Sequence, residues 1–176
     1  MLKKHKMKKL IQGKRISLVY LDETMINDVW HNSLDEDNRK YVPDEVFETY
    51  EEASEVVHFL MENYKTNVCP LVFAVITKEG NNIGYVQLVE IPDGHEIGYH
   101  ISKSFTGQGY ATEAVNLFLE YLKANTELKE VYGIALAINH ASRRVLEKTG
   151  FKLIFEGIDF YQGKKRKIIK TMKAVK

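Results

Sequence analysis

The segment Ile101–Leu122, ISKSFTGQGYATEAVNLFLEYL, places a Gly-x-Gly directly between a strand-like and a helix-like stretch. Apolar residues recur at helical spacing after the glycines, which predicts a helix from about residue 110. At such a turn, backbone N–H groups without helical partners and the positive end of the helix dipole face one small volume. Gly107 and Gly109 have no Cβ that would keep a ligand away from the backbone. The segment therefore predicts a phosphate-binding turn.

The context of this turn limits which ligand it can hold. A dinucleotide-binding fingerprint would have a third glycine at Thr112 and would lie in the first strand-to-helix turn of a parallel sheet. Here the turn follows three strand-like segments joined by short Gly, Asn and Pro turns, which indicates an antiparallel meander. This order argues against NAD or FAD. The glycines would equally suit a turn that binds nothing, so the motif alone leaves that interpretation open.

The segments around the turn predict an α/β (α+β) fold. The expected order is a strand, two helices, three strands, a helix, a strand, a helix and two final strands, with an acidic loop at residues 35–48 between the first two helices. This order predicts a mixed, mostly antiparallel central sheet of about six to seven strands with helices on both faces. Strands are expected at 15–21, 70–77, 83–90, 95–102, 130–136, 151–158 and 165–172, and helices at 22–34, 49–64, 110–122 and 139–150.

Length and charge limit the domain organisation. The 176 residues, 44% of them hydrophobic, suit one core, so residues 13–176 are predicted to form a single domain. Residues 1–12 are predicted to be a basic, flexible tail, because they contain too few apolar side chains to offset the entropy of ordering it. The net charge of +1 gives no reason to expect nucleic acid as a partner. The sequence has no signal-peptide or membrane-span pattern, which predicts a cytoplasmic protein without a membrane partner.

The cysteine and the lysines near the end of the chain have structural interpretations. Cys69 is the single cysteine and has no basic neighbour in sequence, so a structural thiol is expected rather than a nucleophile. No metal site is expected, because the histidines and acidic residues show no ligand spacing and Cys69 has no second cysteine to pair with. Lys164–Lys167 are expected to protect an exposed edge strand from pairing with another sheet.

A second motif, NHASRRVLEKTGF from Asn139 to Phe151, follows the strand expected at 130–136. Together with the Gly-x-Gly turn, it resembles the GNAT superfamily of acetyl-CoA-dependent N-acetyltransferases. The stretch EIGYHISKSFTGQGYATEA, which begins at Glu96, is similar in particular to the RimJ/RimL-type branch, which acetylates ribosomal-protein N-termini. The resemblance extends from about residue 15 to residue 172. It implies a GNAT fold with acetyl-CoA as the cosubstrate.

The resemblance also implies which residues bind acetyl-CoA. In the family, a Gln/Arg-x-x-Gly-x-Gly/Ala loop holds the pyrophosphate, and Thr106 replaces the first residue of that loop here. The Asn-led second motif flanks the pantetheine arm. The implied cofactor-binding residues are Ile101, Thr106, Gly107, Gln108, Gly109, Tyr110, Ala111, Thr112, Asn139 and Ser142.

Two residues are candidates for contact with the leaving sulfur. Many family members have a tyrosine seven residues after the asparagine of the second motif, but Leu146 stands there and has no proton to donate. Ser142 is the substitute that the RimL-like branch suggests, and its hydroxyl would donate a hydrogen bond to the sulfur. Asn139 and Ser142 also suit a helix N-cap and first turn for purely local reasons.

Glu96 is the expected catalytic carboxylate. Acetyl transfer needs an unprotonated amine, and Glu96 lies on the expected strand before the turn, on the same face as Gly98 and His100. It is predicted to take the amine proton directly or through a water. His95 and His100 are rivals, since the ordinary pKa of histidine is near neutral. An exposed strand-end carboxylate without a catalytic role is the other interpretation of Glu96.

The acceptor is indicated only by charge. Carboxylates in residues 35–48 would favour a cationic amine, such as a basic peptide terminus or a polyamine, although such a run also suits a solvated loop. Tyr41 and Trp30 are candidates for one wall of the acceptor pocket. The acidic residues are Asp35, Glu36, Asp37, Asp44, Glu45 and Glu48.

These observations predict an N-acetyltransferase that transfers acetyl directly to a primary amine, on a protein or peptide N-terminus or on a small molecule. Two alternatives stay open: a catalytically weak sensor that binds acyl-CoA, and a nucleotide-binding regulator. RimL-like enzymes are often dimers, so the resemblance implies a homodimer that pairs through the final strand.

Overall fold

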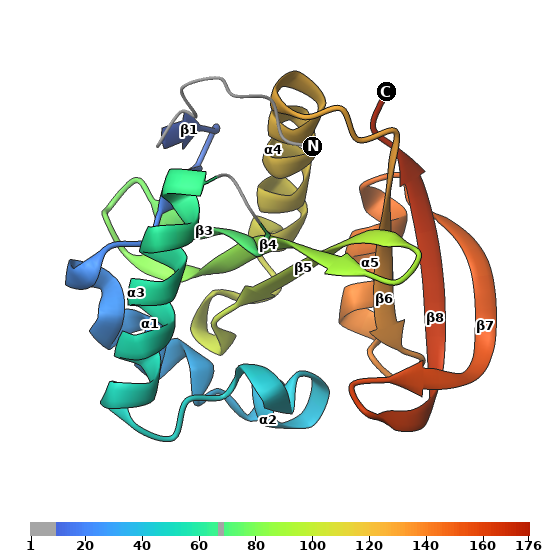
Figure 1. Cartoon of the computed structure of the whole chain (residues 1–176), viewed down its shortest axis with the longest axis horizontal. Helices are drawn as coiled ribbons and strands as arrows, with labels where there is room; N and C mark the ends of the chain where they lie inside the picture. Colours follow the sequence, from blue (N-terminus) through green and yellow to red (C-terminus); the bar gives the residue numbers. More distant parts are fainter. Residues whose placement is uncertain (1–9, 67–68) are drawn as a thin grey trace.

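The computed structural model describes residues 10–66 and 69–176, and within them one eight-stranded sheet runs through the molecule (Figure 1). Its strand order is β1-β2-β3-β4-β5-β6-β8-β7, and every neighbouring pair is antiparallel except β5 and β6. The predicted mixed, mostly antiparallel sheet is confirmed, with more strands than expected. The strands are β1 (Leu10–Gln12), β2 (Ile16–Tyr20), β3 (Leu71–Thr77), β4 (Asn82–Ile91), β5 (Gly94–Ile101), β6 (Glu130–Leu136), β7 (Lys152–Tyr161) and β8 (Lys164–Ala174).

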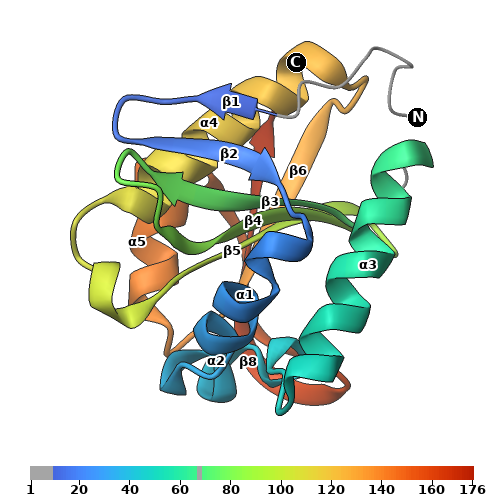
Figure 2. The same cartoon turned by 90° about the vertical axis from the view of Figure 1, so that its left-hand side faces the viewer.

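Helices cover both faces of the sheet, as predicted (Figure 2). On one face, Val57 of α3 is buried in a cluster with Val72 and Ala74 of β3, and α1 packs beside α3. On the other face, Phe118 of α4 and Leu146 of α5 are buried in the larger cluster. Strand β3 is buried on both faces, which explains its continuous apolar run. The α-helices are α1 (Ile26–Ser33), α2 (Glu36–Tyr41), α3 (Tyr50–Thr66), α4 (Tyr110–Asn125) and α5 (His140–Lys148), with short 3₁₀ helices η1 (Glu23–Met25), η2 (Pro43–Glu45) and η3 (Lys103–Phe105).

Two segments differ from the prediction. Residues 35–48 were expected to form a loop but contain α2 and η2. Asp35 is the residue before α2, and its carboxylate accepts a hydrogen bond of 2.8 Å from the backbone N–H of Lys103, a contact between distant parts of the chain. Residues 1–9 of the expected tail lie outside the described residues. Leu10–Gln12, also assigned to that tail, pair with β2 as β1.

The final strand is not the edge of the sheet. β8 pairs with β6 on one side and with β7 on the other. The expectation that the final strand is an edge strand was therefore wrong for residues 168–174, because the final hairpin folds back so that β7 is outermost. Lys164–Lys167 lie beyond the residues paired with β6 and have only β7 as a strand partner. Alternation of apolar residues cannot show this order, since both strands of a hairpin carry it. The final strand is accordingly not available as the pairing edge of a homodimer.

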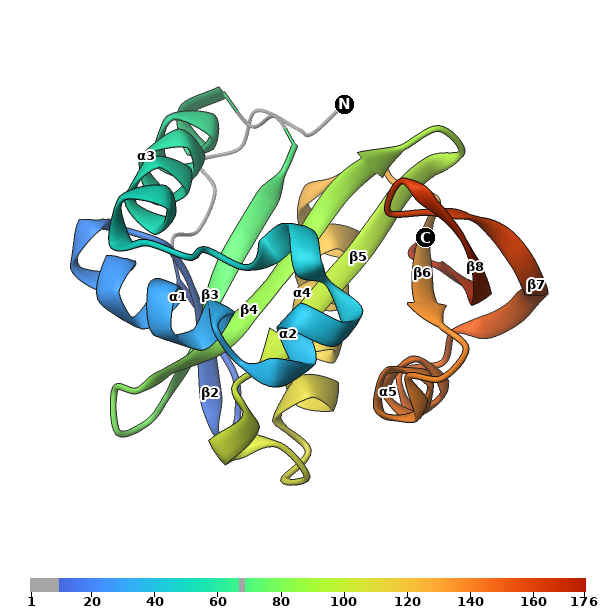
Figure 3. The same cartoon turned by 90° about the horizontal axis from the view of Figure 1, so that it is seen from below.

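Strands β5 and β6 separate in the middle of the sheet. One register pair, Glu96 with Tyr132, joins them. Figure 3 shows the two strands diverging toward the ends that lead into α4 and α5. Because the strands are parallel, both C-terminal ends lie at this opening, and the chain there is free to contact a ligand. Within the described residues, no helix combines the length and the apolar composition needed to cross a membrane.

Candidate active site

The Gly-x-Gly turn lies between η3 and α4, next to the opening between β5 and β6. Gly107 and Gly109 have φ angles of +77° and +83°, the left-handed region that favours glycine. No described residue accepts a hydrogen bond from the backbone N–H groups of residues 107–112. A Cβ built on Gly107 would have no atom within 4 Å. The turn thus presents free donors and the positive end of α4 to open space, an arrangement that fits a pyrophosphate.

Arg15 holds this turn from the opposite end of the chain. Its Nη1 donates a hydrogen bond of 2.9 Å to the carbonyl of Gln108, and its Nε donates one of 2.8 Å to Glu113 in the first turn of α4. Its guanidinium also lies 4.6 Å from the centroid of the Tyr110 ring. Arg15 therefore fixes both sides of the turn. No local sequence pattern indicates this role, because the hydrogen-bonded partners are 93 and 98 residues away.

A cleft of about 680 Å³ extends from the turn into the gap between β5 and β6. The structure brings most of the predicted site residues together around it. Gln108 and His95 are not among the lining residues: Gln108 contacts Arg15 through its carbonyl, and His95 lies near the other end of β5. The predicted residues that line the cleft are Glu96, Ile101, Thr106, Gly107, Gly109, Tyr110, Ala111, Thr112, Asn139 and Ser142.

Glu96 lies where the two strands begin to separate. Burial, together with the nearby charge of Glu45, raises the pKa of its carboxyl group to about 7. The hydroxyl of Tyr161 lies 3.5 Å from Glu96 Oε1. A carboxyl group in this environment can exchange a proton near neutral pH, which is what a general base for an amine requires.

His100, the other cleft residue considered as the base, is paired with Asp35. Its Nε2 lies 3.3 Å from Asp35 Oδ2, and 11% of its side chain is exposed. Burial lowers the pKa of His100, while the charge of Asp35 opposes that shift. The pair joins β5 to the start of α2. His100 therefore fits a structural contact at the wall of the cleft better than a mobile proton carrier.

Two hydroxyl groups lie side by side at the start of α5. Asn139 caps this helix, and its Oδ1 accepts a hydrogen bond of 3.0 Å from the backbone N–H of Ser142. Ser142 Oγ lies 2.9 Å from the hydroxyl of Tyr99. Burial raises the pKa of Tyr99, so its hydroxyl keeps its proton at neutral pH. Leu146 is 1% exposed and belongs to the core.

Tyr99 was not found from the sequence. It lies on β5 and lines the cleft, but its partner Ser142 is 43 residues away. Its hydroxyl also donates a hydrogen bond of 3.0 Å to the backbone carbonyl of Ser142. The only sequence signal was its position on the same strand as Glu96, which did not distinguish it from a core aromatic residue.

The other end of the cleft is rich in hydrogen-bond acceptors. Glu45 accepts a hydrogen bond of 2.7 Å from Gln87, and burial raises the pKa of this carboxyl group to about 7. Asn38 is 1% exposed, and its Oδ1 has no hydrogen-bond partner among the described residues. The same holds for Oε1 of Gln162 in the β7–β8 turn. A bound group with N–H or O–H donors would complement the oxygens of Asn38 and Gln162.

The remaining acidic and aromatic candidates are divided between the cleft and the surface. Asp37, Asp44 and Tyr41 line the cleft together with Glu45. Trp30 instead packs against the cluster formed by α1, α3 and β3. A smaller apolar pocket of about 280 Å³ lies under α1 and α3, and it shares Asn38 and Glu45 with the cleft. Glu36 and Glu48 form exposed ion pairs with Lys103 and Arg39.

The buried carboxyl group of Glu45 should affect stability in a pH-dependent way. Because its pKa in the folded state, about 7, is above the ordinary value of 4.5, folding favours its protonated form, and stability is lost as pH rises through that interval. Glu45→Gln removes the buried charge and keeps an acceptor for Gln87. We expect the variant to be more stable by about 1–3 kcal/mol at about pH 8 and equal to the original near pH 4. Thermal unfolding at both values checks this, and an equal difference at both would contradict it.

Comparisons with known proteins agree with this geometry. Residues 15–152 match a family model described as an acetyltransferase (GNAT) domain. The chain is 34% identical over 112 residues to FsC-acetyl coenzyme A-N(2)-transacetylase of Aspergillus fumigatus, which covers 58% of this chain and 47% of that protein. It is 36% identical over 84 residues to probable N-acetyltransferase YjcK of Bacillus subtilis, which covers 45% and 46%. The chain therefore spans about half the length of the curated relatives it matches.

Solved structures show the same fold at low sequence identity. A GNAT-family acetyltransferase from Bacillus anthracis has a TM-score of 0.80 and 22% identity, covering 94% of this chain and 98% of that chain. RimL, a ribosomal L7/L12 α-N-protein acetyltransferase in complex with coenzyme A, has a TM-score of 0.78 and 16% identity, covering 94% and 97%. With the family model matching residues 15–152 of the 176, the chain belongs to the GNAT family of acetyltransferases.

Proposed function

We propose that the protein is an acetyl-CoA-dependent N-acetyltransferase that transfers acetyl directly to a primary amine. The observation that carries the proposal is the set of unpaired N–H groups of residues 107–112 at one end of a cleft that also contains Glu96. Family membership and the names of the two curated relatives, both N-acetyltransferases, support the same activity.

The turn fits the diphosphate of acetyl-CoA, with its N–H groups as donors and Arg15 holding the turn in place. When bound, acetyl-CoA supplies the acetyl thioester. Glu96 receives the proton that the amine loses as its nitrogen bonds to the acetyl carbon. A hydroxyl of the Tyr99–Ser142 pair would donate a hydrogen bond to the departing sulfur, and Tyr99 is the better proton source because Ser142 is a poor acid. To reach the sulfur, the Tyr99 O–H turns away from the backbone carbonyl of Ser142, to which it donates at 3.0 Å.

The acceptor that fits best is a cationic or neutral primary amine. Asp37 and Asp44 line the cleft, and Glu45 and Glu96 add negative charge as they ionise near pH 7. The oxygens of Asn38 and Gln162 lack donors among the described residues. An ammonium or amine group brings several N–H donors and would satisfy them. A peptide N-terminus or a small molecule such as a polyamine meets this requirement. For a homodimer, we propose β7 as the contact strand, because it is the longer of the two outer strands of the described sheet, with ten residues against three in β1.

The test is a thermal shift of the purified protein with acetyl-CoA, CoA, NAD and ATP in parallel. A ligand at ~100 times its Kd stabilises the fold by ~2.7 kcal/mol, which should raise Tm by roughly 5–10 °C. We expect this shift with acetyl-CoA and CoA only. A screen of primary amines with detection of the released thiol follows. No shift with either CoA species, or an equal shift with NAD, would contradict the assignment of residues 107–112 as the acetyl-CoA-binding turn.

A further inference from the structure

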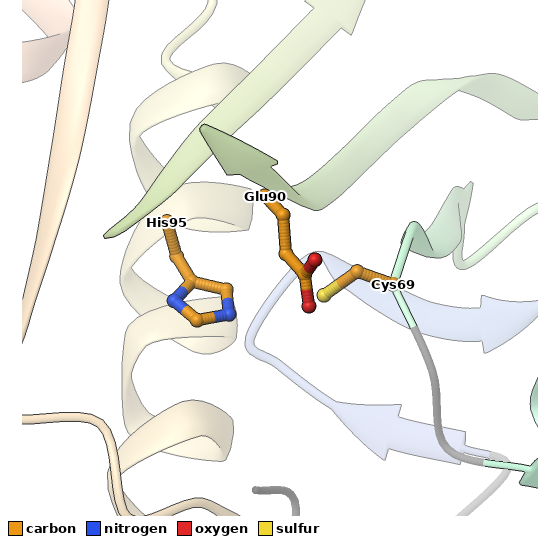
Figure 4. A group of neighbouring side chains, drawn as sticks. All are labelled: Cys69, Glu90 and His95. Atoms are coloured by element: carbon orange, nitrogen blue, oxygen red, sulfur yellow. The ribbon is translucent and has the colours of Figure 1, made fainter. Parts of the chain in front are cut away.

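Three metal-ligating side chains from separate parts of the sequence meet on the sheet, outside the cleft. Cys69, Glu90 and His95 each bring one ligand atom, and these atoms all lie within 4.8 Å of one another (Figure 4). Cys69 precedes β3, Glu90 is in β4 and His95 is in β5. None of the three lines the cleft that contains Glu96.

The sheet register explains why they meet. Leu71 of β3 pairs with Leu88 of β4, which pairs with Ile97 of β5. These three buried side chains form one row on the face covered by α4. Two residues further along each strand, the next row on that face contains Cys69, Glu90 and His95. Strand pairing aligns Glu90 with His95, and Cys69, two residues before the first pair of β3, lies beside them.

We propose that this row, the Cys69–Glu90–His95 cluster, binds a divalent metal ion of the Zn²⁺ type. Thiolate, imidazole and carboxylate are the ligands of protein zinc sites, at about 2.0–2.3 Å from the ion. Donor atoms on one tetrahedral ion lie roughly 3.3–3.8 Å apart, so the three groups need to approach by about 1–1.5 Å at most.

The cluster has free ligand atoms and an open position on the solvent side, which suits metal binding. The side chains of Glu90 and His95 form no hydrogen bond or ion pair with another described residue. Cys69 and His95 are half-buried, whereas Glu90 is exposed, which leaves a fourth coordination position on the solvent side. On binding, the thiol loses its proton to solvent. The ion would join the start of β3 to the β4–β5 hairpin, a structural role separate from acetyl transfer.

The test uses the full chain, freed of metal with a chelator, and titrates it with Zn²⁺ or Co²⁺. We expect one equivalent to bind, Zn²⁺ to raise Tm by several degrees, and Co²⁺ to give thiolate-to-metal charge-transfer absorption. Cys69→Ser should abolish the absorption, and His95→Gln should weaken binding at least about tenfold. His58→Gln, at an exposed histidine of α3 outside the cluster, should change neither the absorption nor the affinity for the metal.

Each result decides the proposal. A lost charge-transfer band in Cys69→Ser together with weaker binding in His95→Gln supports the site. Metal binding of equal strength in the original and in both variants places the ion elsewhere and overturns it, as does failure of the original protein to bind Zn²⁺. If Cys69→Ser does not fold, the affinities of His95→Gln and His58→Gln for Zn²⁺ are compared. Weaker binding in His95→Gln alone supports the site, and equal binding in the two variants contradicts it. These readouts do not depend on acetyltransferase activity.

Discussion

Replacing Glu96 by glutamine is expected to lower kcat/KM for the amine acceptor by about 10²- to 10³-fold, while the Kd for acetyl-CoA stays unchanged. The amide has nearly the shape of the carboxyl group but cannot accept a proton from the amine. Glu96 lies where β5 and β6 separate, away from the turn that fits the diphosphate. Steady-state kinetics with a primary amine and calorimetric titration with acetyl-CoA measure the two quantities.

Glu130→Gln is the matched control, because Glu130 is an exposed carboxylate on the neighbouring strand β6 and does not line the cleft. The Glu130→Gln variant should keep both the kcat/KM for the amine and the Kd for acetyl-CoA. The comparison also separates the proposed enzyme from the alternative, a sensor that binds acyl-CoA. If the original protein binds acetyl-CoA but acetylates no amine, and Glu96→Gln behaves identically, the sensor is the better interpretation.

Replacing Gly107 by alanine is expected to weaken acetyl-CoA binding by about 10- to 100-fold. Gly107 has a φ of +77°, so a side chain there strains the backbone by roughly 1–2 kcal/mol. Gly107 lines the cleft, and a Cβ there would meet no protein atom within 4 Å, so it would occupy space open to the ligand. Strain and steric exclusion therefore act on the same ligand. The Kd of acetyl-CoA measured by calorimetry checks the prediction.

Gly80→Ala supplies the control for strain alone. Gly80 lies in the β3–β4 turn with a φ of +89°, and a Cβ there would also have no atom within 4 Å. Both variants should lose a similar few degrees of Tm, but the one at Gly80 should keep its affinity for acetyl-CoA. Equal affinities in the two variants would show that the turn at Gly107 does not contact the ligand.

The parts of the site that the sequence predicted are those encoded locally. The turn at residues 107–112 and the cap at Asn139 are visible because glycines, capping residues and helical periodicity act over a few positions. Strand alternation combined with the family resemblance predicts Glu96 as a site residue. The roles of these residues in catalysis and binding are still predictions.

The parts that the sequence did not predict depend on distant pairing. Arg15 and Tyr99 have their hydrogen-bond partners between 43 and 98 residues away, so no local pattern marks them. The six residues of α2 are too few to show a helical period, and their composition resembled a loop. The interior position of β8 is likewise a matter of strand order, which alternation does not encode.

The single register pair between β5 and β6 has a mechanical consequence. In terms of strand pairing, the sheet consists of two parts. One contains β1 to β5 and the other contains β6, β8 and β7, and they are joined at the pair of Glu96 and Tyr132. A ligand that contacts both the turn after β5 and the start of α5 after β6 would link the two parts of the sheet. When the ligand is bound, amide hydrogen exchange should therefore slow more in β5 and β6 than in the other strands.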